Sequence, residues 1–300
     1  MNRREFKWRV DKLEEELILR AFLHEKKGVS KRLLAAVKYR GGALAVNGQA
    51  VTVRHQLQIG DEVTLKLPPE NQSELILPEN IDLQICYEDL DLLIINKPAQ
   101  MATMPSMNHP RQTLANAVLF YYKETGTEAT FHAVNRLDRG TSGLLIIAKH
   151  RYAHDLLSQA QQTGRLTRTY QALVAGTLMD EGIFNAPIGR KPTSIIERMV
   201  REDGKKAVTL YKSLASSEGY SLVELSLKTG RTHQIRVHLS GAGFPLLGDE
   251  LYGGDRSLLD HQALHCNRVK LQHPFTNEPL VIECKSPSSW TPIIRRMNLT

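Results

Sequence analysis

Residues that could carry chemistry are densest in one short stretch, Arg136-Leu137-Asp138-Arg139, which the polar run 140–143 follows. The apolar run 144–148 predicts a buried strand, so Asp138 lies on a loop that enters the core. Loops held by a rigid scaffold often position reactive groups, and a held carboxylate can serve as a nucleophile or a base. An aspartate between two arginines is more often part of a loop salt bridge, so this stretch alone assigns no function.

The histidines and cysteines do not form a metal-binding pattern. His233 and His238 are five residues apart, which separates them by about 140° on a helix and puts them on opposite faces of a strand. No HExxH motif or carboxylate cluster accompanies them. Cys86, Cys266 and Cys284 show no CxxC spacing. We therefore expect neither a metal ion nor an organic cofactor, and a metal-dependent nuclease or hydrolase is disfavoured.

Short strand-like runs dominate the chain after residue 80, with two helical stretches between them. Consecutive strands with few helices favour an α+β fold around a largely antiparallel sheet over a doubly wound parallel one. Neither a sequence repeat nor a GxGxxG motif appears. The expected strands lie within 81–87, 91–98, 143–149, 169–176, 220–230 and 263–271, and the expected helices within 111–123 and 152–162.

The first seventy residues predict a small unit of two helices, a hairpin and a further strand. Ser30 can cap the second helix, and Asn47-Gly48 between two apolar runs is a strong hairpin signal. Prolines and polar residues after residue 67 indicate a linker. The helices are expected over 13–24 and 30–40, the hairpin over 43–53 and the further strand over 59–67. The predicted domain limits are 1–70 and 81–300, with a linker over 71–80.

Composition and charge limit the class of protein. Hydrophobic residues make up 41% and charged residues 24% of the chain, which is typical of a globular protein. No run approaches the ~18 apolar residues of a membrane helix, and the charged N-terminus does not resemble a secretory signal, so we expect a cytoplasmic protein. Residues 1–70 hold 14 basic and 9 acidic side chains within a net charge of +7, an excess that permits binding to a polyanion without proving it.

Five segments, in order, resemble the signatures of the RluA-type RNA pseudouridine synthases, which isomerise uridine in structured RNA. The central segment is R-L-D-x-x-T-S-G-L-L over 136–145, and the similarity covers roughly residues 85–285. The sequence departs from the family pattern at Asn135, where His is frequent, at Gly140, where an acidic residue is usual, and at Arg168-Thr169, which replaces a Lys-rich pair. We expect these departures to affect substrate choice more than the reaction. The other signatures are 87–99, 168–176, 229–239 and 245–253.

The resemblance implies a reaction and a set of site residues. Pseudouridine formation exchanges an N–C for a C–C glycosidic bond within one molecule, so no redox cofactor or energy source is required. Asp138 is implied as the essential carboxylate, which either attacks the anomeric carbon or removes a ribose proton. Arg236 is implied as the cation beside it, and Tyr170 as the aromatic face for the uracil. Arg136 is expected to fill the gap left by the flipped base, and Arg231 to bind a phosphate.

The helix-helix-hairpin order of residues 1–70 resembles the S4-type RNA-binding domain. In such a domain Lys31, Arg32 and Lys38 would meet phosphates from one helix, where charge attraction supplies sequence-independent affinity. A basic helix face that is merely solvated is the alternative for this segment taken alone.

Together these expectations predict an RNA pseudouridine synthase that acts on ribosomal or transfer RNA. We expect a monomer with no protein partner and no membrane contact. The main alternative is a non-catalytic S4-type RNA-binding protein, against which the intact set of implied catalytic residues argues. A nucleoside glycosidase is chemically closer to this reaction than a metal-dependent nuclease or hydrolase is. Such glycosidases usually need a second carboxylate to activate water, and the sequence indicates none.

Overall fold

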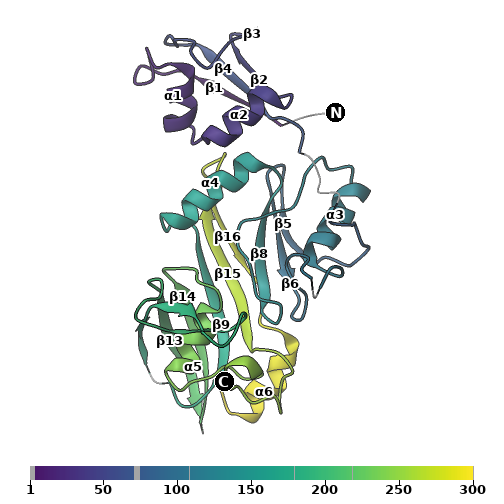
Figure 1. Cartoon of the computed structure of the whole chain (residues 1–300), viewed down its shortest axis with the longest axis vertical. Coiled ribbons are helices and arrows are strands. Elements are labelled where there is room, and N and C mark those ends of the chain that lie inside the picture. The colour runs from purple at the N-terminus through teal and green to yellow at the C-terminus, as the bar shows by residue number, and fades with distance from the viewer. Residues whose placement is uncertain (1–3, 71–74, 108, 179, 218, 300) are drawn as a thin grey trace.

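The computed structural model describes residues 4–70, 75–107, 109–178, 180–217 and 219–299. Two β-sheets with separate hydrophobic cores organise the chain, a small one near the N-terminus and a large one formed by the rest (Figure 1). Residues 71–74 of the predicted linker lie outside the described residues. None of the helices in the described ranges is long and apolar enough to cross a membrane.

The small sheet has four antiparallel strands and packs against two helical segments. Its elements are β1 (Glu5–Arg9), α1 (Leu19–Ala21), which continues as a π-helical turn (Phe22–Lys26), α2 (Lys31–Tyr39), β2 (Ala43–Val46), β3 (Gln49–Ala50) and β4 (Glu62–Lys66). The strands pair in the order β1-β4-β2-β3. Apolar side chains from every one of these elements except β3 form its core.

Local signals in this unit are confirmed. The Ser30 hydroxyl accepts a hydrogen bond from the backbone N–H of Leu33 at 3.1 Å and so caps α2. Asn47 and Gly48 have φ values of 52° and 78°, the left-handed pair that a two-residue hairpin turn requires. Sequence patterns therefore located the start of α2 and the β2–β3 turn.

The predicted helix over 13–24 is wrong in its first half, because α1 begins at Leu19. The backbone before α1 instead bonds to a distant segment: Glu16 N–H donates to the Leu57 carbonyl, and Leu57 N–H donates to the Leu17 carbonyl. These tertiary hydrogen bonds satisfy groups that a helix would otherwise pair. Strand β1 was not predicted, because its sequence is mostly charged and only Phe6 among its side chains is buried.

A ten-stranded sheet organises the larger unit. Its strands are β5 (Ile85–Glu88), β6 (Leu92–Lys97), β7 (His132–Ala133), β8 (Ser142–Ala148), β9 (Thr167–Ala175), β10 (Glu181–Asn185), β13 (Val208–Ser217), β14 (Tyr220–Leu227), β15 (Leu264–Gln272) and β16 (Pro279–Glu283). They pair in the order β10-β13-β14-β9-β15-β8-β6-β5, with β16 beside β15 and β7 beside β8. Among the described strands only the β15–β8 pair is parallel. This confirms the α+β class with a largely antiparallel sheet.

Among the described residues, four α-helices accompany this sheet: α3 (Leu114–Glu124), α4 (Arg151–Gln162), α5 (Gln234–Gly241) and α6 (Thr291–Arg296). Helices α3 and α4 lie beside the β5–β8 half, and α5 and α6 lie beside the β9–β14 half (Figure 1). Side chains from α3, α4 and α5 join those of the central strands in one core. Strand β8 is buried along its whole length, so it is a firm base for the loop that precedes it.

The two units contact each other through aromatic and charged side chains. The Phe6 ring centre lies 5.1 Å from that of Tyr152 in α4 and 4.7 Å from that of Phe275. Arg4 donates two hydrogen bonds to the buried carboxylate of Asp91, at 2.7 and 2.8 Å. The small unit therefore has a defined position against the α4 side of the large one.

Candidate active site

Asp138 lies on the loop between β7 and β8, as the sequence predicted. The Thr103 hydroxyl donates to the Leu137 carbonyl at 2.9 Å, and the Lys97 ammonium donates to the Arg139 carbonyl at 3.3 Å. Lys97 is fully buried, and burial lowers its pKa to about 7 while the charge of Asp138 opposes that shift. The loop is therefore held on both sides of Asp138, whose own side chain is 31% exposed.

Arg236 lies near the start of α5 and connects two carboxylates. Its Nε and Nη2 donate to Asp249 at 2.7 Å each, and its Nη1 donates to Oδ2 of Asp138 at 3.2 Å. The guanidinium carbon lies 4.8 Å from the centre of the Tyr252 ring. Burial alone would lower the pKa of Arg236, but Asp249 and Asp138 outweigh that effect and raise it. Asp138 therefore has a fixed cation beside it.

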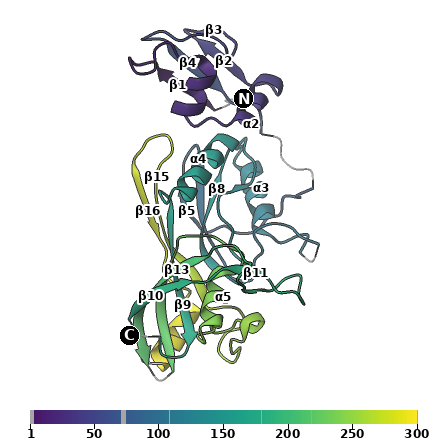
Figure 2. The same cartoon turned by 60° about the vertical axis from the view of Figure 1, so that its left-hand side comes forward.

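Two cavities meet at Asp138. The larger, about 630 Å³, is lined in part by Ile196. This residue lies in the loop of a two-stranded ribbon formed by β11 (Ile188–Arg190) and β12 (Arg198–Val200), which projects beside α5 (Figure 2). The smaller, about 70 Å³, is lined by Tyr170 of β9. Asp138, His233 and Arg236 line both cavities. A molecule bound across them would contact the Asp138 carboxylate.

The other residues predicted for the large unit gather around the smaller cavity. Tyr170 is buried, and burial raises the pKa of its hydroxyl, which therefore stays protonated. Arg136 and Arg231 are exposed and line the same cavity. The Arg231 guanidinium Nε donates to the Lys206 carbonyl at 3.0 Å. Segments far apart in the sequence thus bring all five predicted residues of this unit together.

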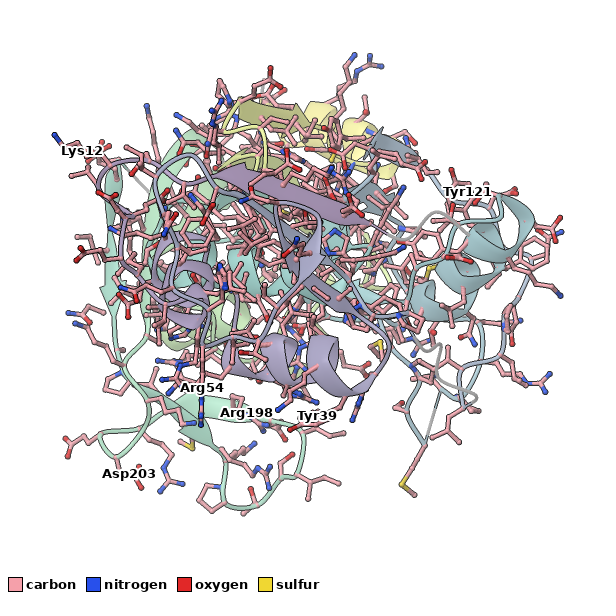
Figure 3. The ribbon with its side chains drawn as sticks, turned by 90° about the horizontal axis from the view of Figure 1, so that it is seen from above. Lys12, Tyr39, Arg54, Tyr121, Arg198 and Asp203 are labelled. Carbon is pink, nitrogen blue, oxygen red and sulfur yellow. The ribbon has the colours of Figure 1, made fainter. Side chains whose placement is uncertain are left out.

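Lys31, Arg32 and Lys38 are exposed on α2 in the small unit and do not belong to this site. Lys31 and Lys38 line another cavity of about 830 Å³, and the Lys38 ammonium lies 4.8 Å from the centre of the Tyr39 ring. Seen from above, Tyr39 and Arg198 of β12 lie on the same side of the molecule (Figure 3). The C-terminal end of α2 and the ribbon beside the active-site cavity therefore share one side.

Three residues of the site received no catalytic or binding role from the sequence: His233, which was considered only as a metal ligand, Asp249 and Tyr252. Asp249 precedes a 3₁₀ turn (Glu250–Tyr252), which ends at Gly253 with φ 82°. Residues three apart share one side of a 3₁₀ turn, so Asp249 and Tyr252 both reach Arg236. The sequence signal that could have indicated these two residues is an aspartate and a tyrosine three positions apart, between Gly248 and Gly253.

Two departures from the family pattern have a structural explanation. Asn135 is buried, and its side-chain oxygen accepts a hydrogen bond from the Ile146 N–H of β8 at 2.9 Å, which tethers the active-site loop. Gly140 lines the larger cavity, and a Cβ at this position would clash with the side-chain amide of Gln262. An acidic residue at position 140 would require Gln262 to move.

Metal-ligating side chains converge elsewhere. Within the described part of the chain, one group has three candidate ligands close together: Asp89, Asp91 and His273. The Arg4 guanidinium already forms two hydrogen bonds with Asp91, and it supplies the positive charge there. This group contributes to the contact between the two units and lies outside both cavities at Asp138.

Comparisons with known proteins identify the family to which this chain is similar. The family described as RNA pseudouridylate synthase matches residues 91–241. The uncharacterized RNA pseudouridine synthase YjbO of Bacillus subtilis (strain 168) is 46% identical over 272 residues, which cover 90% of this chain and 96% of the relative. Ribosomal large subunit pseudouridine synthase D of Haemophilus ducreyi is 36% identical over 257 residues, covering 81% of this chain and 78% of the relative.

Solved structures share the fold. Human RNA Pseudouridylate Synthase Domain Containing 4 aligns with a TM-score of 0.60 at 23% identity, covering 72% of this chain and 94% of that chain. Human RNA Pseudouridylate Synthase Domain Containing 1 aligns with a TM-score of 0.58 at 24% identity, covering 75% of this chain and 89% of that chain. The enzymatic interpretation is thus favoured over a non-catalytic RNA-binding protein, and the chain belongs to the RNA pseudouridine synthase family, as its RluA-type signatures implied.

Proposed function

We propose that this pseudouridine synthase uses Asp138 to act on the ribose of a bound uridine. The supporting observation is the pair of Asp138 Oδ2 and Arg236 Nη1, 3.2 Å apart where two cavities meet. The Arg236 guanidinium supplies a fixed positive charge beside this carboxylate, and the exposed part of the Asp138 side chain can contact the substrate.

The reaction balances without an added reactant. The bond from uracil N1 to ribose C1′ breaks, a bond from C5 to C1′ forms, the C5 hydrogen leaves as a proton and N1 gains a proton. The Asp138 carboxylate can attack C1′ or remove a ribose proton, and both routes need this same group. Tyr170 offers its ring to the uracil, with its protonated hydroxyl available near the base.

The arginines at the smaller cavity would hold the RNA open. A paired or stacked uridine must leave its stack to reach Asp138, which costs a few kcal/mol. Arg136 has a planar guanidinium at the mouth of the cavity, which can stack where the base was. Arg231 is exposed beside it and can donate to a phosphate.

We propose that residues 1–70 form an S4-like RNA-binding domain, joined by residues 71–80 to a catalytic domain over 81–300. Its separate core and the exposed Lys31, Arg32 and Lys38 support this role. The α2 end and the β11–β12 ribbon lie on one side of the molecule (Figure 3), so one RNA can contact both.

Ribosomal RNA is the substrate class that we favour. Relatives at 34–36% identity are described as ribosomal large subunit pseudouridine synthase D, and transfer RNA is the second candidate. We also propose a cytoplasmic location, because both substrate RNAs function there. The monomeric state stays a prediction.

The experiment supplies unmodified ribosomal and transfer RNA, made by transcription, to the purified protein. Pseudouridines are then mapped at nucleotide resolution, with Asp138→Asn as the matched control. We expect one or a few modified uridines in ribosomal RNA and none with the variant. Binding without modification by the wild type, or equal modification by the variant, would contradict the proposal.

A further inference from the structure

His233 is a titratable group at the active site to which the reaction above gives no role. It directly precedes α5 in the left-handed conformation, with φ 57° and ψ 19°. Its side chain is 12% exposed and lines both cavities at Asp138. A left-handed non-glycine residue is uncommon and is held by its surroundings.

A hydrogen-bond chain runs from the ribbon to this histidine. The Arg198 N–H of β12 donates to the Tyr252 hydroxyl oxygen at 2.9 Å. That hydroxyl lies 2.8 Å from Nδ1 of His233, and Nδ1 is the one acceptor found for its proton within the described ranges. Tyr252 therefore donates to Nδ1, and the imidazole proton lies on Nε2.

The Nε2 atom faces the reactive carboxylate. It lies 3.8 Å from Oδ2 of Asp138, the same oxygen that accepts from Arg236 at 3.2 Å. A shift of about 1 Å would complete the hydrogen bond, and catalytic hydrogen bonds commonly tighten when substrate binds. Oδ1 of Asp138 accepts no hydrogen bond from any described residue. Nη1 of Arg236 and Nε2 of His233 thus both approach Oδ2, and Oδ1 stays available to the substrate.

We infer that His233 is a positioning residue: it donates from Nε2 to Oδ2 of Asp138, in the tautomer that Tyr252 sets, so that Oδ1 faces the ribose. This inference rests on the proposed role of Asp138. Burial, aided by the charges of Arg236 and Arg198, lowers the pKa of His233 although Asp138 opposes the shift. The neutral imidazole is therefore the form that holds the carboxylate.

A matched pair of substitutions separates this role from folding. The Gln side-chain amide reaches the Nε2 position, so His233→Gln keeps the donor to Asp138. The Asn amide reaches only the Nδ1 position, so His233→Asn loses that donor. Asn tolerates the left-handed conformation better than Gln does. The variant expected to fold better is therefore expected to be the slower enzyme.

We expect His233→Asn to slow single-turnover pseudouridine formation by about 10- to 100-fold, the scale of a small misplacement of a reactive group. His233→Gln should stay within about threefold of the wild type. RNA affinity should change by less than about threefold in both, because neither substitution removes a charged RNA contact. Tyr252→Phe keeps the ring over Arg236, and combining it with His233→Asn should slow the reaction no further.

The pH–rate profile gives a readout that a purely structural role would not change. A carboxylate that has lost a donor binds a proton more readily, so the acidic limb should move to higher pH in His233→Asn and stay in place in His233→Gln. The other ionisable groups around Asp138 and His233 are the same in both variants. These groups are Lys97, Arg198, Arg236, Asp249 and Tyr252.

Equal rates and profiles for His233→Asn and the wild type would overturn the inference. Equal slowing of the Gln and Asn variants would also overturn it, because the donor would then not matter. Activity in Asp138→Asn would instead refute the proposed role of Asp138. The two failures are therefore distinguishable.

Discussion

Asp249 and Asp138 both bind the Arg236 guanidinium, but in different surroundings. Replacing each with Asn should therefore lower the free energy of unfolding by different amounts. Asp249→Asn removes a carboxylate whose side chain is 2% exposed and which accepts two hydrogen bonds of 2.7 Å from Arg236. The amide can accept only one of these, and its NH₂ group faces a guanidinium N–H. We expect the free energy of unfolding to fall by about 3–5 kcal/mol, as for a buried ion pair that loses one partner, because the remaining contact with Asp138 is longer and more exposed.

Asp138→Asn is the matched comparison. It weakens one hydrogen bond of 3.2 Å to a side chain that is 31% exposed, so the free energy of unfolding should fall by no more than about 1 kcal/mol. Urea unfolding followed by the fluorescence of buried Trp290, in a Trp8→Phe background, reports on the large unit alone. Equal losses, or a larger loss in Asp138→Asn, would refute Asp249 as the main anchor of Arg236.

Three further outcomes are expected. Burial would raise the pKa of Asp91, but hydrogen bonds from a histidine and an arginine outweigh this effect and lower the pKa to about 2. The resulting stabilisation is present above about pH 4 and is lost as the pH falls through about 2. The difference in unfolding free energy between wild type and Asp91→Asn should therefore shrink between those pH values, and a constant difference would contradict this. Tyr170→Phe should bind RNA within a few-fold of wild type but react more than about tenfold slower in a single-turnover assay, and full activity would return Tyr170 to a packing role. Changing Lys31, Arg32 and Lys38 to Gln should lower the slope of log affinity against log salt by roughly 2–3, and an unchanged slope would deny α2 a part in binding.

Short-range signals in the sequence predicted much of the fold. The cap at Ser30 and the turn at Asn47 and Gly48 depend on adjacent residues alone, and both are confirmed. The apolar runs that became β6 and β8 are buried, so their composition sufficed to identify them. The false start of the first helix arose from backbone pairing with Leu57, about forty residues away, which no local pattern contains.

The site was predicted only in part, because some of its contacts also depend on segments that are distant in the sequence. Family signatures placed Asp138, Arg236 and Tyr170 in one site, and the structure brings them around one cavity. The bidentate contact of Asp249 and the imidazole of His233 depend on how a 3₁₀ turn and a left-handed residue orient side chains. Such orientation comes from tertiary packing, so residue types and spacing alone did not identify these two.

The direct test of the account is single-turnover release of tritium from uracil C5 in a matched RNA, with wild type and Asp138→Asn side by side. A binding titration and a thermal melt accompany it, so that lost chemistry is separated from lost affinity or lost fold. We predict that the variant folds and binds RNA but releases tritium at least about a thousandfold more slowly, each tenfold corresponding to about 1.4 kcal/mol. Release by Asp138→Asn near the wild-type rate would contradict the assignment of Asp138 as the residue that acts on the ribose.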